Sequence, residues 1–139
     1  MKKHIDDNCI FCKLANGQIP TNSIYEDDDF KVILDAAPAA KGHAIILPKT
    51  HAANLFELPE EYVEKIFAIA KKCGKAIKET YNYDGLNVLQ NNGEAAGQTV
   101  FHLHVHLIPR MNDDKININW QQGESTDGET VAEEIKKHI

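Results

Sequence analysis

The sequence predicts an α+β fold in which one long helix packs on an antiparallel sheet. Apolar runs of strand length occur in two pairs, and each pair is joined by a connection too short to hold a crossover helix. Between the pairs, residues 59–80 carry apolar side chains at helical spacing. A sheet with one apolar face has to bury that face, so the amphipathic helix is expected to pack on it.

Four elements are expected before the long helix. They are a short helix over residues 10–17, a possible edge strand over 23–28, and two buried strands over 30–38 and 42–49. Gly17 would end the helix, and Pro38 and Gly42 would form the turn between the buried strands. This turn leaves no room for a helix, so the two strands should form an antiparallel hairpin.

The clearest element is the helix over residues 59–80, PEEYVEKIFAIAKKCGKAIKET. Pro59 suits the first turn, and the two glutamates after it interact favourably with the helix dipole. The apolar residues that recur at helical spacing are Tyr62, Ile66, Ile69, Cys73 and Ile77. Two further strands are expected over 84–92 and 99–109, on either side of the loop GEAAGQ, which brings the sheet to about five strands.

Length and composition suit a single domain followed by a tail. The chain has 139 residues, 42% of them hydrophobic, which is enough for a sizeable core. We expect a cytoplasmic protein, because no apolar run approaches the ~20 residues of a membrane helix and no signal peptide is evident. The net charge of −6 argues against binding to a nucleic-acid backbone. Residues 1–110 would form the domain. Residues 111–139 would be a polar tail, with a short helix over 130–139, that is partly disordered or docks on a partner subunit.

The segment FHLHVHLIPR, residues 101–110, carries the strongest functional signal. On a strand, side chains alternate between the two faces, so His102, His104 and His106 would share one face and the apolar residues the other. Side chains on one face stand about 7 Å apart, close enough for two imidazoles to bind one metal ion. Alternatively, one imidazole is a nucleophile whose neighbours fix its tautomer and handle protons.

Cys9 and Cys12 have the spacing of a chelating pair, since two thiolates two residues apart can reach one tetrahedral ion. A redox pair has the same spacing but normally follows a strand, and none precedes Cys9. The candidates for two further ligands are His4, His43, His51, His138 and the histidines of segment 101–110. A closed site of four ligands would be structural and would leave the other histidines for chemistry. The odd number of cysteines argues against a disulfide framework, and Cys73 is expected to be a buried apolar residue.

These motifs resemble those of the histidine triad (HIT) family of nucleotide hydrolases and transferases. HLHVHLI matches the signature of that family, in which three histidines alternate with apolar residues. LDAAPAAKGHAIILPKTH resembles the family's hairpin with its Asp, fourth His and Pro-Lys-x-His, and NNGEAAGQTVFHLHVH resembles its phosphate-binding loop and triad strand. The resemblance covers roughly residues 9–110 and implies the HIT fold and a homodimer with the long helix and adjacent strands at the interface. After the triad the chain reads Pro-Arg, where the phosphoramidase branch of the family typically reads Gly-Gly-Arg.

The resemblance implies an enzyme that cleaves the α-phosphate linkage of a purine nucleotide derivative, either a nucleoside phosphoramidate or a dinucleoside polyphosphate. His104 would be the nucleophile and form a nucleotidyl-histidine intermediate, while His106 and His43 orient it and contact the phosphate. The nucleotide-binding positions implied are Asp35 for the ribose, Asn91, Gln98 and Thr99 for the phosphate and leaving group, and Phe11, Leu14 and Ile33 for the base. The last three residues fit a role in the core equally well.

Family members that carry the Cys pair bind zinc, and the matching ligands here are Cys9, Cys12, His51 and His102. The resemblance thus implies a structural zinc ion. Two alternatives remain open from the sequence. One is a nucleotide-binding regulatory protein whose hydrolysis is incidental. The other is a catalytic zinc hydrolase with His102, His104 and His106 as ligands, in which the two cysteines would be dispensable for metal binding.

Overall fold

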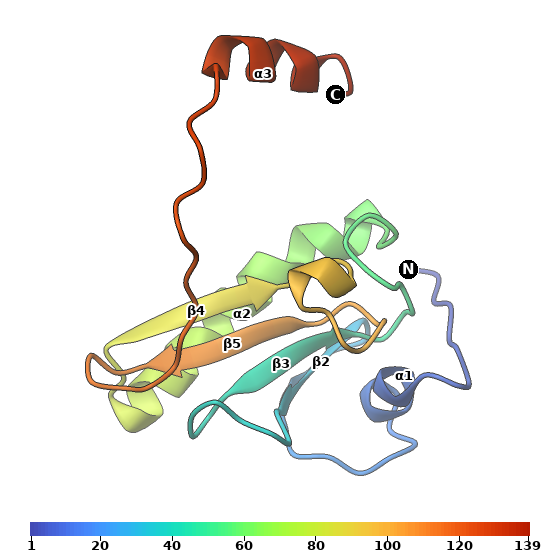
Figure 1. The fold of residues 1–139 in the computed structure, drawn as a ribbon. Coiled ribbons are helices and arrows are strands. Elements are labelled where there is room, and N and C mark those ends of the chain that lie inside the picture. The colour runs from blue at the N-terminus through green and yellow to red at the C-terminus, as the bar shows by residue number, and fades with distance from the viewer.

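The computed structural model describes residues 1–139 and has a five-stranded antiparallel sheet between two helices of unequal length (Figure 1). The strand order is β1-β2-β3-β5-β4. The strands are β1 (Ser23–Glu26), β2 (Phe30–Leu34), β3 (Ala44–Pro48), β4 (Gly85–Gln90) and β5 (Val105–Arg110). The helices are α1 (Ile10–Ala15), α2 (Glu60–Tyr81) and α3 (Gly128–Lys136), and a short 3₁₀ helix, η1 (Glu94–Ala96), precedes β5. The predicted α+β fold with one long and one short N-terminal helix is therefore confirmed.

The two faces of the sheet are covered by different helices. One face packs against α2 in the main core, which includes Val32, Ile46 and Leu107 from the strands and Tyr62, Ile66 and Ile69 from the helix. Successive strand residues point to opposite faces, so Ile33, Ile45 and Leu47 form a second cluster on the other side. This smaller cluster receives α1 through Ala15, Phe11 and Leu14. The side of the sheet beneath α1 is where the candidate site lies.

The helix ends follow local signals in the sequence. Helix α2 is followed by its C-cap Asn82, which adopts the left-handed conformation with φ 57°, a geometry that Asn tolerates better than most residues. Within α2, Gly74 allows a close approach to the sheet, since a Cβ there would lie 2.5 Å from a methyl carbon of Leu86. Cys73 beside it is buried in the main core, as expected. No helix has the length and apolar character needed to cross a membrane.

The last strand is shorter than predicted. A strand was expected over residues 99–109, yet β5 begins only at Val105 and residues 101–104 run outside the ladder. The reason lies in hydrogen bonds to another part of the chain. The backbone N–H of Leu103 donates to the carbonyl of Ala52 at 2.7 Å, and His102 Nε2 lies 2.9 Å from the carbonyl of Pro48. These contacts draw the segment toward the end of β3 and the loop after it.

The tail after β5 is extended and ends in α3, which stands apart from the rest of the molecule (Figure 1). The helix covers residues 128–136 rather than the expected 130–139. Every residue from 119 to 139 is exposed.

Candidate active site

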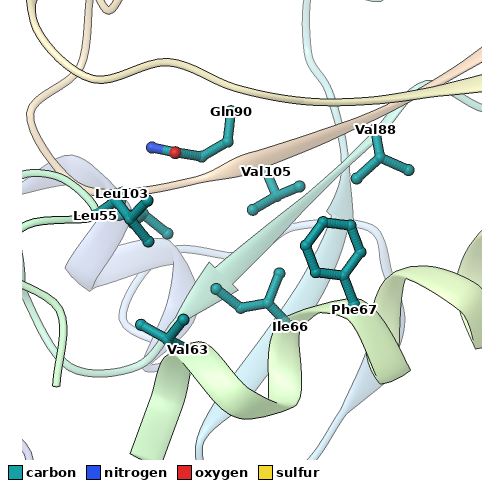
Figure 2. Close-up of a pocket in the computed structure, with 8 residues that line it drawn as sticks. All are labelled: Leu55, Val63, Ile66, Phe67, Val88, Gln90, Leu103 and Val105. Atoms are coloured by element: carbon teal, nitrogen blue, oxygen red, sulfur yellow. The ribbon is translucent and has the colours of Figure 1, made fainter. Parts of the chain in front are cut away.

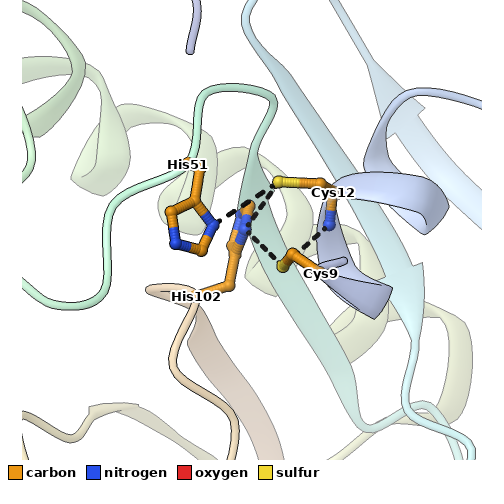
Figure 3. Close-up of side chains that lie close together, drawn as sticks. All are labelled: Cys9, Cys12, His51 and His102. Atoms are coloured by element: carbon orange, nitrogen blue, oxygen red, sulfur yellow. Dashed lines mark hydrogen bonds between the residues drawn. The ribbon is translucent and has the colours of Figure 1, made fainter. Parts of the chain in front are cut away.

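Two cysteines and two histidines from distant parts of the sequence meet beside α1 (Figure 3). Cys9 Sγ lies 3.3 Å from His102 Nδ1, and Cys12 Sγ lies 3.4 Å from the same atom. His51 Nδ1 is 3.5 Å from Cys12 Sγ. Ligand atoms around a tetrahedral zinc ion lie about 3.3–3.8 Å apart, given bonds of 2.0–2.3 Å. The four residues that the sequence suggested for metal binding are thus brought together at separations that suit one ion.

The surroundings of this cluster leave both Nδ1 atoms available for a metal. His102 is fully buried and its Nε2 donates to the carbonyl of Pro48, so Nδ1 carries the lone pair. His51 Nε2 lies 4.0 Å from a carboxylate oxygen of Asp6. Burial lowers the pKa of His102 to about 4, which keeps the imidazole neutral near pH 7. Burial also raises the pKa of the Cys12 thiol to about 11, so its thiolate form needs a nearby cation such as a bound metal.

His104 lies next to the cluster with one ring nitrogen free. Its Nδ1 is 2.8 Å from the carbonyl of His102, and a carbonyl oxygen only accepts, so Nδ1 carries the proton. In the neutral ring Nε2 then holds the lone pair, as a nucleophile requires. The edge of the Phe11 ring meets the His104 ring with centroids 4.9 Å apart, and the His106 ring lies 5.0 Å away on another side. The imidazole is therefore fixed in both tautomer and orientation.

A chain of hydrogen bonds also determines the tautomers of His43 and His106. The backbone N–H of Ala39 donates to His43 Nδ1 at 2.9 Å, so the proton of a neutral His43 is on Nε2. That atom lies 2.9 Å from His106 Nδ1, which must accept. The proton of His106 is consequently on Nε2, where it can be donated to a ligand. Burial lowers the pKa of both rings, that of His106 to about 4, so both are neutral at physiological pH.

Asp35 completes this second cluster. One of its carboxylate oxygens lies 3.5 Å from His43 Nε2 and 3.8 Å from His106 Nδ1, and the other accepts from the backbone N–H of Ala37 at 2.8 Å. The residue follows β2 directly, and its own N–H donates to the carbonyl of His43 at 2.9 Å. The β2–β3 hairpin thus holds Asp35 and His43 together, and β5 adds His106. A carboxylate in this position can accept two hydroxyl hydrogen bonds.

The loop before β5 contains the residues expected to contact phosphate and leaving group. Gln98 is buried, and its side chain braces the loop: Oε1 accepts from the N–H of Gly93 at 2.8 Å, and Nε2 donates to the carbonyl of Ala53 at 2.6 Å. Thr99 is exposed at the edge of a hollow of about 490 Å³ that Cys9 and His51 also line. Asn91 is half-buried, and its side-chain amide lies close to the position of Gly97.

The three residues expected to line a base pocket lie together where α1 packs on the sheet. Ile33 is buried, whereas Phe11 and Leu14 are half-buried and pack against the same cluster. They thus belong to the smaller core, while Phe11 also touches His104. A smaller, apolar groove of about 230 Å³ lies elsewhere, between α2 and β4, and contains none of the histidines (Figure 2). The cluster of histidines and this apolar groove are therefore on different sides of the molecule.

Together these features define a small α+β protein in which a histidine-lined site adjoins a cluster of two cysteines and two histidines. The HIT domain family model matches residues 16–113, and the chain belongs to this family, as the resemblance of its motifs implied. A HIT family protein from Bacillus anthracis superposes with a TM-score of 0.89 and 41% identity, over 96% of this chain and 98% of that one. Because residues 111–139 are about a fifth of the chain, this superposition extends into the tail.

Two further relatives bear on the chemistry. Adenosine 5′-monophosphoramidase HNT1 of Saccharomyces cerevisiae is 43% identical over 109 residues, which cover 78% of this chain and 66% of that protein. A Zn-bound histidine triad family protein from Mycobacterium smegmatis superposes with a TM-score of 0.75 and 39% identity, over 84% of each chain.

Sequence reasoning missed several groups that organise the site. They are the N–H of Ala39 and the carbonyl groups of Pro48 and His102, all of them backbone atoms. No residue type marks such atoms, so only the fold reveals them. The structure also counts against a metal site made of His102, His104 and His106, because the ligand atoms of His102 and His106 point into two separate clusters.

Proposed function

We propose that this protein is a hydrolase that cleaves the α-phosphate linkage of a purine nucleotide derivative through a nucleotidyl-histidine intermediate on His104. The observation that carries the proposal is the hydrogen bond from His104 Nδ1 to the carbonyl of His102, which leaves Nε2 as a free lone pair beside a donor on His106. The similarity to a yeast adenosine 5′-monophosphoramidase supports the cleavage of a nucleotide phosphoramidate linkage. Nucleoside phosphoramidates and dinucleoside polyphosphates are the substrate classes proposed.

The reaction has two displacements at phosphorus. In the first, His104 Nε2 forms a bond to the α-phosphorus, and the bond from phosphorus to the leaving nitrogen or oxygen breaks with uptake of a proton by the leaving group. In the second, water attacks the same phosphorus, the N–P bond breaks, and the nucleoside monophosphate is released. The imidazole suits both steps because it is a nucleophile and a leaving group. The proton on His106 Nε2 is the donor available to a phosphate oxygen.

The nucleotide would lie across the end of the β2–β3 hairpin. Asp35 is proposed to accept the ribose hydroxyls, and Phe11, Leu14 and Ile33 to provide the apolar surface for the base. Asn91, Gln98 and Thr99 are proposed to border the phosphate and leaving group. Since the side chain of Gln98 already braces the loop, its contribution there is to hold the backbone of residues 93–98 in place.

The cluster of Cys9, Cys12, His51 and His102 is proposed to hold a structural zinc ion. Its two thiols, two Nδ1 atoms and their separations fit zinc, and a Zn-bound histidine triad protein is among the solved relatives. When bound, zinc would tie α1 and Cys9 before it to the loop after β3 and to the segment that leads into β5. Three free cysteines also suit a reducing compartment, so the cytoplasm is the proposed location.

A homodimer is proposed to form along β4, which is an edge strand of the sheet. An edge strand presents free N–H and C=O groups that pair readily with another strand. Beside it, Val88 and Phe67 line the apolar groove between β4 and α2 (Figure 2), and Phe67 is 75% exposed. The long helix is also expected at the interface. Its residues Tyr62, Ile66 and Ile69, which suit either an interface or the core, are buried within the chain's own core.

The first test is intact-protein mass spectrometry after a brief acid quench with an adenosine phosphoramidate. A nucleotide-sized adduct is expected in the wild type and in His138→Ala, whose histidine lies in the exposed tail, but not in His104→Ala. His104→Ala should retain zinc and bind nucleotide without turnover. Hydrolysis without an adduct would show direct attack by water and overturn the covalent mechanism. Nucleotide binding without turnover in the wild type would favour a regulatory binding protein instead.

A further inference from the structure

The start of the tail is fastened to the sheet by Arg110, the last residue of β5. Its Nε and Nη2 donate to the two carboxylate oxygens of Asp114 at 2.8 and 2.9 Å, and Nη2 also donates to the carbonyl of Ile116 at 2.9 Å. Nη1 donates to Asn87 on the neighbouring strand β4 at 2.8 Å. A planar guanidinium bonded to both oxygens of a carboxylate gives a well-defined geometry. The direction in which the tail leaves the body is therefore set by side-chain contacts.

Beyond this fastening, the tail has no support from its own body. The hydrogen bonds of α3 stay within the helix, including the N-terminal cap in which Asp127 contacts Thr130. Val131 and Ile135 are four residues apart and so lie on one face of α3, and the two residues are 37% and 56% exposed. Isolated helices shorter than about 12–15 residues are marginal in water, and most helices in proteins depend on tertiary packing. The nine residues of α3 therefore require a surface to pack on.

The outward course of the tail is shared with a solved relative. The superposition on the Bacillus anthracis protein covers 96% of this chain, which reaches well beyond Ile116. A tail that had only its own flexible linker to hold it would not be expected to follow the same course in two proteins at 41% identity. A surface outside the body of the same chain must therefore hold the tail. A second copy of the chain is the partner available to both proteins.

The tail also points toward the side on which a second copy is expected. It starts beside β4, the unpaired edge strand, and α3 lies well beyond that edge, away from β1, β2 and β3 (Figure 1). Residues 117–127 are extended, and at about 3.3 Å per residue they can reach across to a neighbouring sheet. A copy paired along β4 would lie in the path of the tail.

We infer that α3 is an exchanged arm: in the dimer, the apolar face of α3 from each chain packs on the body of the other copy. The inference rests on the homodimer proposed above and does not depend on the proposed reaction. Val131 and Ile135 are the contact residues, and Arg110 with Asp114 aims the arm. Each chain then contributes one helix to its partner, so the contact is made twice in the dimer.

The arm is tested by photocrosslinking in the full-length protein. A photoreactive p-benzoylphenylalanine replaces Ile135, and a matched variant carries it at Asp28, an exposed residue in the turn between β1 and β2. Irradiation of the Ile135 variant is expected to give a covalent product of twice the chain mass of 15.6 kDa, well above the yield from Asp28. A yield no higher than that of the Asp28 control, or a crosslink within one chain, would overturn the inference.

A second variant separates the arm from the strand interface. Val131→Gln with Ile135→Gln removes the apolar face and keeps good helix formers at both positions. Loss of four buried aliphatic side chains per dimer should raise the dimer dissociation constant at least about tenfold. Glu134→Gln with Lys137→Gln, in α3 and at its C-cap, should leave the dissociation constant unchanged. If the wild type is a dimer and neither double variant changes its dissociation constant, the homodimer stands and the exchanged arm is ruled out. If the wild type is a monomer, both the homodimer and the arm are ruled out.

Discussion

His43 Nε2 lies 2.9 Å from His106 Nδ1, and the direction of this hydrogen bond is set by the N–H of Ala39 on the far side of the His43 ring. Because the backbone N–H of Ala39 can only donate, His43 accepts at Nδ1 and donates from Nε2. His106 in turn accepts at Nδ1 and presents Nε2–H. One backbone amide thus determines which ring nitrogen of each histidine carries the proton. The pair works in this way only while both rings are neutral.

Acid is expected to destabilise the protein through this pair. Burial lowers the pKa of His106 to about 4, while an unfolded histidine titrates near ~6.5. Between these two pKa values His106 binds a proton in the unfolded chain but not in the folded chain, so the free energy of unfolding falls as pH falls. One such group contributes at most about 1.4 kcal/mol per pH unit. Urea unfolding of wild type and His106→Asn in excess zinc should show a shallower fall in the variant. Equal slopes would contradict the buried neutral state.

Asp35→Asn is expected to weaken nucleotide binding. The amide keeps the shape of the side chain and one acceptor, so the bond from Ala37 N–H can remain, but the charge and one acceptor site are lost. Hydrogen bonds to charged groups contribute about 1.5–3 kcal/mol, so the dissociation constant for AMP should rise roughly 10- to 100-fold. Isothermal titration calorimetry measures this change directly. Asp28→Asn, an exposed control outside the site, should bind as the wild type does, and unchanged binding by Asp35→Asn would remove the proposed ribose contact.

Cys12→Ser is expected to abolish zinc binding and destabilise the fold. The serine hydroxyl is a poor zinc ligand, and its introduction leaves only Cys9, His51 and His102 to bind the ion. Cys73→Ser is the matched control, because that thiol is also buried but lies in α2. It should lower the melting temperature without changing metal content. Metal analysis of the two purified variants decides the point: full zinc content in Cys12→Ser would show that the cluster is not the metal site.

The parts of this fold that follow local periodicity could be predicted from the sequence. Helix α2 was placed within one residue at each end, because its spacing of apolar residues and the residues at its start are local signals. The four residues that meet in the Cys/His cluster were also named together as candidate metal ligands. That identification depended on the family resemblance, since nothing in the spacing of Cys12 and His51 alone says that they meet.

The conformation of residues 101–104 could not be predicted from local patterns. Their alternation of histidine and apolar residues is typical of a strand, yet the hydrogen bonds from Leu103 to Ala52 and from His102 to Pro48 remove them from the sheet. These are contacts between residues about 50 positions apart, and no local pattern encodes them. The same holds for Gln98, whose bracing role depends on the carbonyl of Ala53.

Phe67→Glu is expected to convert the proposed homodimer to a monomer. Phe67 is 75% exposed in the single chain, so the substitution costs little stability there, but in the dimer it would place a charge in the apolar groove beside Val88. Ile24→Glu at the opposite edge of the sheet is the control, since Ile24 is 44% exposed on β1. Sedimentation velocity over a range of concentrations should show a dimer for the wild type and for Ile24→Glu. Because the introduced carboxylate would find no cationic partner among the residues that line the groove, a Phe67→Glu variant that remains fully dimeric would place the interface elsewhere than at β4 and α2.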